Sequence, residues 1–130
     1  MTFWKTFIKT WLPVCLWCAG IFFQSSFSTP KIGPEWPYKY YFAHGLIYAL
    51  LGILIARAFY GISWWKNRKL LLIVVTTILA SLYGLSDEWH QFFVINRTAD
   101  LIDWLSDMIG SVMGAVVYVE WVSLRQRESI

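Results

Sequence analysis

The sequence predicts an all-α fold, a polytopic membrane bundle of about four transmembrane helices with both termini in the cytoplasm. Three observations predict it. Apolar residues make up 58% of the chain, more than a soluble domain of 130 residues carries. Long stretches contain no charged side chain, and the basic side chains gather in alternate connections between those stretches. We expect each apolar stretch to be helical, because a helix satisfies its own backbone hydrogen bonds in lipid.

Three spans follow directly from the gaps between charges. Residues 10–30, 40–56 and 70–86 contain no Asp, Glu, Lys or Arg. A bilayer core of ~30 Å is crossed by about 20 helical residues. We therefore expect helices near residues 8–28, 40–59 and 69–90.

The fourth span, near residues 103–123, is unusual because its charge-free part is short. Only residues 108–119 lack charge, which at about 1.5 Å per residue reaches roughly 18 Å. To cross the membrane, this helix must carry Asp107, with Asp103 as a further candidate, below the membrane surface. Ionisable groups in a bilayer are costly and usually mark a functional site. We treat residues 1–130 as one transmembrane domain.

The basic residues predict the orientation. Eight of the 11 Lys and Arg side chains fall on one side of four spans, and three fall on the other. The larger set is expected in the cytoplasm, and the bias toward anionic lipid accounts for the net charge of +3 without a nucleic-acid partner. The cytoplasmic set is Lys5, Lys9, Arg57, Lys66, Arg68, Lys69, Arg125 and Arg127, and the outer set is Lys31, Lys39 and Arg97. The first helix also has features of a signal peptide, whose cleavage after Ser28 would leave three spans.

Small and polar residues recur at helical spacing on every predicted span. We therefore expect one shared interior site near the outer surface. In chain order the stripes are Gly20, Gln24 and Ser28; His44 and Tyr48; Ser81, Gly84, Glu88 and Gln91; and Asp103, Asp107, Gly110 and Gly114. The two glycines of the last helix are spaced to let helices approach closely. Thr98 or Asp100 is expected to cap that helix after a turn at Asn96-Arg97.

The carboxylates of the last two helices are the main candidates for chemistry. Asp103 and Asp107 lie one turn apart, and Glu88 can approach from the neighbouring helix. Two carboxylates ~5 Å apart repel by about 3 kcal/mol at an effective dielectric near 20. Glu88, Asp103 and Asp107 must therefore hold a divalent cation, share a proton, or pair with His44 or Arg97. The structural alternative is an ion-pair network that only fixes the bundle.

His44 and Arg97 allow several interpretations. His44 could act as acid, base, ligand or hydrogen-bond donor, or could be a satisfied buried histidine. Arg97 could form a fork with Asp103, bind a phosphate or carboxylate ligand, or lie beside a lipid headgroup. His90 is expected at the interface, away from the Glu88 face. The Cys-x-x-Cys pair at residues 15–18 lies in an apolar helix, which favours a structural over a redox role.

The spaced polar motif resembles the signature of the VanZ-like membrane proteins. The matching residues are Glu88-x-x-Gln91, Asn96-Arg97 and Asp103-x-x-x-Asp107-x-x-Gly110-x-x-x-Gly114, together with His44-x-x-x-Tyr48 and Gln24-Ser25-Ser26. The chain departs from the family pattern at Asp107, often Asn, at Asn96, commonly Gly, and at Tyr40-Tyr41, usually Asp-Lys. The resemblance implies a small bacterial protein of the inner membrane, tied to the cell envelope, in a family named for low-level resistance to the glycopeptide teicoplanin.

Three hypotheses for the function follow. The first is an outward-facing pocket that binds a lipid-linked or cell-wall-related headgroup, lined by His44, Tyr48, Glu88, Gln91, Arg97, Asp103 and Asp107. The second is a membrane-embedded hydrolase or transferase acting on a lipid phosphate. There Glu88 or Asp103 would serve as base and His44 as acid, with metal-activated water as an option. The third is a structural or assembly partner, and the sequence fixes neither the oligomeric state nor the ligand.

Overall fold

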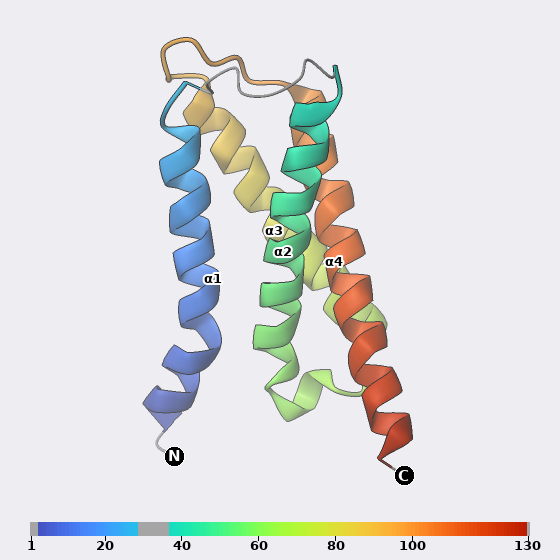
Figure 1. Cartoon of the computed structure of the whole chain (residues 1–130). Coiled ribbons are helices and arrows are strands. Elements are labelled where there is room, and N and C mark those ends of the chain that lie inside the picture. Colours follow the sequence, from blue (N-terminus) through green and yellow to red (C-terminus); the bar gives the residue numbers. More distant parts are fainter. Residues whose placement is uncertain (1–2, 29–36, 130) are drawn as a thin grey trace.

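The structure, a computed structural model, describes residues 3–28 and 37–129. Within them the chain forms four α-helices, one 3-10 turn and no strand. The helices are α1 (Phe3–Ser25), α2 (Lys39–Tyr60), α3 (Lys69–Gln91) and α4 (Leu101–Glu128), and the 3-10 turn η1 (Ser63–Trp65) joins α2 to α3 (Figure 1). All four helices are long and apolar enough to cross a membrane. The predicted all-α bundle with four spans is confirmed.

The two ends of the bundle differ in charge. We call the end at which α1 and α3 finish and α2 and α4 begin the acidic end, because Glu88 and Asp103 lie there. The opposite end, the basic end, carries both ends of the described chain (Figure 1). That arrangement agrees with an even number of spans. Which end faces the cytoplasm stays a prediction.

The start of α4 confirms two local predictions. Asp100 is the N-cap residue, and its Oδ1 accepts a hydrogen bond from the backbone N of Ile102 at 2.9 Å. Asn96 has a φ of +62°, a left-handed conformation that Asn tolerates better than most residues and that fits the predicted turn. The cap lets α4 begin two residues earlier than expected, so Asp103 lies in its first turn.

Helices α2 and α4 pack with their backbones in direct contact. A Cβ placed on Gly110 would lie 2.1 Å from the carbonyl O of Gly45, and one on Gly114 would lie 1.9 Å from that of Ala49. A Cβ on Gly52 would lie 2.4 Å from the carbonyl O of Ser111. Small residues allow such an approach, which gains van der Waals contact where lipid offers no hydrophobic driving force.

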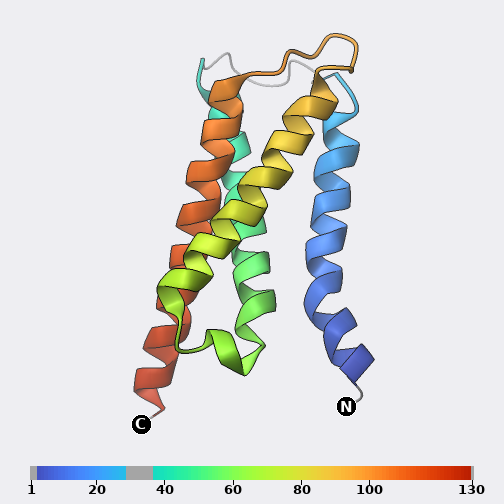
Figure 2. The ribbon, with the colours of Figure 1, turned by 180° about the vertical axis from the view of Figure 1, so that it is seen from behind.

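Helix α3 crosses the bundle at an angle. It begins beside α4 at the basic end and finishes beside α1 at the acidic end, as both views show (Figures 1 and 2). The acidic ends of α3 and α4 therefore diverge. Trp104 Nε1 spans the divergence by donating to the carbonyl O of Ser81 at 3.0 Å.

Helix α1 turns a different face to the bundle from the one predicted. Gly20, Gln24 and Ser28 are exposed, so the expected inward stripe is wrong. Its buried residues are Val14, Ile21 and Ser25. The apolar contacts made by Val14 and Ile21 decide which face is inward, because they join the core formed with Tyr48 and Leu51. Two polar bonds also fix the helix: Trp17 Nε1 donates to the carbonyl O of Ile47 at 3.0 Å, and the Tyr83 hydroxyl donates to that of Cys18.

Candidate functional site at the acidic end

His44 and Asp107 form a pair inside the bundle. His44 Nδ1 lies 3.0 Å from Oδ1 of Asp107, and Asp107 is fully buried. The close approach of α2 and α4 at Gly45 and Gly110 places these side chains within reach of each other. On α3, Gly84 leaves room for the carboxylate, because a Cβ there would lie 3.1 Å from Asp107 Oδ2.

Asp103 and Glu88 approach the same imidazole. Asp103 Oδ2 lies 4.0 Å from Nε2 of His44, one helical turn closer to the acidic end than Asp107. One ligand atom each of His44, Glu88 and Asp103 all lie within 4.8 Å of one another. We call His44, Glu88, Asp103 and Asp107 the acid–histidine cluster. It contains four of the predicted site residues.

Several oxygens of the cluster are buried without a hydrogen-bond partner. Glu88 Oε2 accepts from the backbone N of Asp100 at 2.9 Å, but its Oε1 has no partner. The same holds for Asp103 Oδ1 and Asp107 Oδ2. The hydroxyl of the fully buried Tyr48 is also without a partner. Buried polar atoms without a partner are rare in native proteins, and each calls for an explanation such as an ordered water or a bound ion.

A second polar network lies beside the cluster, and it takes up two of the predicted site residues. Asp87 Oδ2 accepts from Nε2 of Gln91 at 3.0 Å, and Asp87 Oδ1 accepts from the hydroxyl of Ser25 on α1. Arg97 Nη1 donates to Gln91 Oε1 at 3.3 Å. We call Ser25, Asp87, Gln91 and Arg97 the Asp87 network. Gln91 therefore contacts Asp87 and Arg97 rather than the acid–histidine cluster.

Arg97 has a structural role, since it forms hydrogen bonds with backbone carbonyls at the end of α1. Its Nε donates to the carbonyl O of Phe27 at 3.0 Å and its Nη2 to that of Gln24 at 3.2 Å. Basic side chains satisfy the free carbonyls at helix C-termini in this way, so Arg97 fastens the loop before α4 to the end of α1. None of the hydrogen bonds described for Arg97 goes to Asp103, so the fork with Asp103, one of the three interpretations of Arg97, is not the arrangement in the described residues.

Asp87 and Ser25 were not among the predicted site residues, although Ser25 belongs to the Gln24-Ser25-Ser26 stretch that matches the family pattern. Asp87 lies three residues after Gly84 and four before Gln91, so the spacing that grouped those two also includes it. Ser25 continues the inward stripe of Val14 and Ile21 at helical spacing. The sequence did not show which face of α1 is turned inward, because that depends on how α1 packs against the other helices. Tyr41 was not predicted as a site residue either, and its hydroxyl donates to Asp100 Oδ2 at 3.2 Å.

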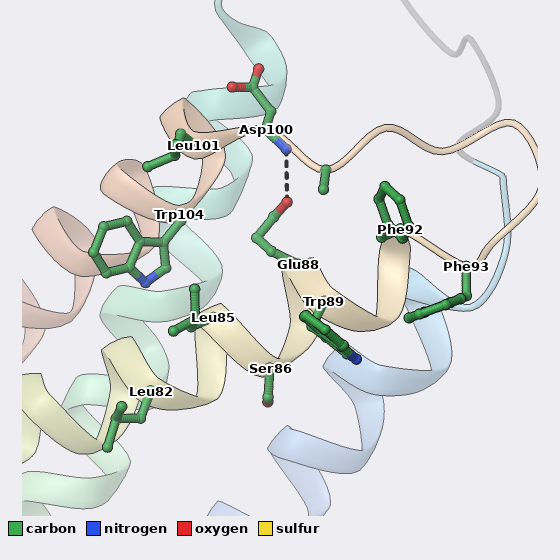
Figure 3. Close-up of a pocket in the computed structure, with 11 residues that line it drawn as sticks. Leu82, Leu85, Ser86, Glu88, Trp89, Phe92, Phe93, Asp100, Leu101 and Trp104 are labelled. Atoms are coloured by element: carbon green, nitrogen blue, oxygen red, sulfur yellow. Dashed lines mark hydrogen bonds between the residues drawn. The ribbon is translucent and has the colours of Figure 1, made fainter.

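Two cavities flank α3 at the acidic end. The first, which we call the apolar groove, has a volume of about 790 Å³ and lies between the diverging ends of α3 and α4 (Figure 3). Trp104 and Leu101 line it from α4, and Leu85 and Trp89 line it from α3. Glu88 lies between these walls and points toward the Asp100 amide (Figure 3). The groove is thus mainly apolar, and the Glu88 carboxylate forms part of its lining.

The second cavity, the polar cavity, has a volume of about 340 Å³ and lies among α1, α2 and α3. Its lining combines the two polar groups described above, with His44 from the cluster and Asp87 and Arg97 from the network. Tyr48 lines it as well. Of the predicted site residues, His44, Tyr48 and Arg97 therefore border this cavity, while Glu88 borders the apolar groove.

The remaining polar candidates have structural partners. Nε2 of His90 lies 3.0 Å from the hydroxyl oxygen of Ser26, and its ring stacks on Phe22 with centroids 4.4 Å apart. His90 therefore belongs to the contact between α1 and α3. Cys15 and Cys18 are both free thiols, with Cys15 exposed and Cys18 half-buried, and the structural interpretation of that pair stays a prediction.

Comparison with known proteins identifies a family. The model of the family described as VanZ/LLP1 matches residues 7–124, which is nearly the whole chain. No significant match was found among curated proteins or among solved structures.

Proposed function

The chain belongs to the VanZ/LLP1 family, and from that premise we propose that it binds a lipid-linked or cell-wall-related headgroup at the acid–histidine cluster. The observation that carries the proposal is the position of Glu88. This side chain belongs to the cluster and also borders the apolar groove. A single lipid molecule can therefore place its hydrocarbon in the groove and its headgroup against the carboxylates.

The groove suits a hydrocarbon chain. Its walls are mainly aromatic and aliphatic, with Trp89, Phe92 and Phe93 on one side of Glu88 and Leu101 and Trp104 on the other (Figure 3). Its volume of about 790 Å³ is in the range of sites that bury small ligands. Because α3 and α4 are both long and apolar enough to cross a membrane, the groove between them would be open to lipid in a bilayer.

The headgroup must suit an acidic site. Glu88, Asp103 and Asp107 face one histidine, and Arg97 is held by carbonyl oxygens and Gln91. Hydroxyl and amine groups can donate to the unpartnered oxygens directly. A phosphate would need a cation between it and the carboxylates. Capture of a cell-wall precursor headgroup at the outer face of the inner membrane would change its access to antibiotics, and this is the route by which we propose a role in teicoplanin resistance.

Binding of a polyprenyl phosphate to the purified protein tests the proposal. With a divalent cation such as Zn²⁺ present to bridge phosphate and carboxylates, we expect saturable stabilisation of the wild type against heat in detergent, with less stabilisation by the uncharged polyprenol. Asp103→Asn should weaken binding of the phosphate at least ten-fold. Glu120→Gln is the matched control, because it also removes one acid from α4 but lies exposed toward the basic end. Equal binding of the phosphate by both variants would contradict the proposal.

The groove is tested separately by filling it. Leu85→Trp adds bulk to the lining and should weaken binding of both polyprenol and polyprenyl phosphate. Leu79→Trp is its control, since Leu79 is exposed on the same helix outside the groove. If Leu85→Trp bound both lipids as well as Leu79→Trp, the hydrocarbon would lie elsewhere.

A second candidate function is hydrolysis or transfer at a lipid phosphate, and the His44–Asp107 contact favours it. A carboxylate that orients an imidazole is the arrangement by which enzymes prepare a general base or acid. Release of phosphate from a polyprenyl diphosphate by the wild type, lost in His44→Gln and kept in His90→Gln, would support this function. Binding of the polyprenyl diphosphate without release of phosphate would contradict this second function and favour the first proposal, binding of a headgroup.

A further inference from the structure

We propose that His44, Glu88 and Asp103 bind one divalent transition-metal ion, and that Asp107 acts as the positioning residue for His44. The site is built from three helices, since His44 lies on α2, Glu88 on α3 and Asp103 on α4. It goes beyond the proposed binding of a headgroup, because the ion would be held by the protein whether or not a lipid is present.

The three ligands already converge. Their ligand atoms lie within 4.8 Å of one another, and Asp103 Oδ2 is 4.0 Å from Nε2 of His44. Bond lengths of about 2.0–2.2 Å place ligand atoms of a tetrahedral zinc site roughly 3.4 Å apart. Small side-chain rotations therefore close the site. The backbones need not move, because α2 and α4 are already in contact at Gly45 and Gly110.

The orientation of His44 is the second observation. Asp107 is fully buried and its Oδ1 lies 3.0 Å from Nδ1 of the imidazole. A carboxylate that accepts from one ring nitrogen leaves the other as an unprotonated ligand, the arrangement found around histidines that bind metal. Nε2 is the free nitrogen here, and it is the one nearest Asp103.

Unpartnered oxygens provide the third observation. Glu88 is only 6% exposed, and its Oε1 has no hydrogen-bond partner although it belongs to the side chain that approaches His44 and Asp103. Asp103 Oδ1 is buried and unpartnered as well. Burial of a carboxylate oxygen without a donor is costly. An ion coordinated by these oxygens satisfies them and removes the repulsion between the two carboxylates.

The ligand set selects the class of ion. One imidazole and two carboxylates suit Zn²⁺, Mn²⁺ or Fe²⁺, whereas Mg²⁺ prefers an all-oxygen set with several waters. Three protein ligands leave at least one coordination position open, as in catalytic rather than structural zinc sites. That position is where an anionic headgroup would bind, a consequence that rests on the proposed function.

Equilibrium dialysis of the lipid-free protein against Zn²⁺ tests the site, with elemental analysis as the readout. We expect one tightly bound Zn²⁺ per wild-type chain and no comparable binding of Mg²⁺. Glu88→Gln and Asp103→Asn should each lower the affinity at least 100-fold. Asp107→Asn should lower it about 10- to 100-fold, since it removes only the orienting partner. Glu120→Gln should bind Zn²⁺ as the wild type does.

If the carboxylate variants fail to fold, the absorption spectrum of the Co²⁺-loaded protein still tests the site. This measurement needs only the wild type and a Cys15→Ser/Cys18→Ser control. Ligands from His44, Glu88 and Asp103 predict visible d–d bands without thiolate-to-metal charge transfer, unchanged in the control. Thiolate bands, or loss of Co²⁺ in the control, would assign the metal to the cysteines. Absence of saturable Zn²⁺ and Co²⁺ would overturn the site while leaving metal-free lipid binding open to its own test.

Discussion

A Cβ on Gly110 of α4 would lie 2.1 Å from the carbonyl oxygen of Gly45 on α2, so these two glycines bring the helix backbones into contact. His44 and Asp107 lie within one turn of that contact on the same two helices. The distance of 3.0 Å between their side chains therefore depends on the absence of a side chain at Gly110, whereas a Cβ on Gly45 would make only an ordinary contact, 3.7 Å from the carbonyl O of Ser106.

Gly110→Ala should destabilise the bundle. The added methyl group would overlap a backbone oxygen that cannot rotate away, so α2 and α4 must separate. We expect a loss of at least about 2 kcal/mol in the free energy of unfolding in mixed detergent micelles. Gly20→Ala is the control, because a Cβ at Gly20 meets nothing within 4 Å and should change stability by less than about 0.5 kcal/mol. Equal stability of the two variants would show that the helices do not pack in this way.

Ser25→Ala should loosen the contact between α1 and α3. It removes the hydroxyl that donates to the buried Asp87 and leaves that carboxylate oxygen unsatisfied. We expect a loss of about 1–2 kcal/mol in the free energy of unfolding. Ser86→Ala, which alters an exposed hydroxyl on α3, should have a negligible effect. The proposed network would be wrong if both serine variants unfolded alike.

Arg97→Lys should release the end of α1. A lysine cannot reproduce the three hydrogen bonds that the guanidinium makes to Gln24, Phe27 and Gln91. Hydrogen exchange measured by mass spectrometry should therefore speed up at least ten-fold at backbone amides 24–28. Arg125→Lys, at the opposite end of the bundle, should leave exchange in that segment unchanged. Unchanged exchange in Arg97→Lys would show that other contacts hold α1 in place.

The predicted orientation can be checked with single cysteines in a Cys15→Ser/Cys18→Ser background. A membrane-impermeant maleimide applied to intact cells should label Thr98→Cys, in the loop before α4 at the acidic end. It should label Ser129→Cys, at the basic end, only after the membrane is permeabilised, because basic residues favour the cytoplasm. The reverse pattern would place the acid–histidine cluster on the cytoplasmic side.

Much of the fold could be predicted because the bilayer limits the choices. Charge-free lengths gave α2 and α3 almost to the residue, and the short charge-free part of α4 correctly singled out Asp107 as a buried acid. Helical spacing grouped Asp103, Asp107, Gly110 and Gly114 on one face, and the structure uses the glycines for packing. These features are local, since they depend on hydropathy, spacing and capping within single helices.

The composition of the candidate site was harder to predict. The predicted pocket joined Gln91 and Arg97 to Glu88 and His44, whereas the structure divides these residues between two networks. The division follows from the crossing angle of α3, whose end approaches α1 and leaves α4. Spacing within α3 cannot show that Asp87 contacts Ser25 on α1 while Glu88 approaches His44 and Asp103. Asp87 and Glu88 are adjacent in the sequence, and their different partners depend on where the other helices lie.

The sequence by itself determined that this is a four-span membrane protein with acids buried near one end, because lipid excludes charge and each helix must satisfy its own backbone. Only the tertiary structure decided that His44 contacts Asp107, that Arg97 binds the end of α1, and that an apolar groove reaches Glu88. Those contacts join residues 60 or more positions apart or depend on the angle between helices. Their physical cause is the way the helices pack, with glycine against backbone between α2 and α4 and with α3 crossing the bundle at an angle, which no single helix contains.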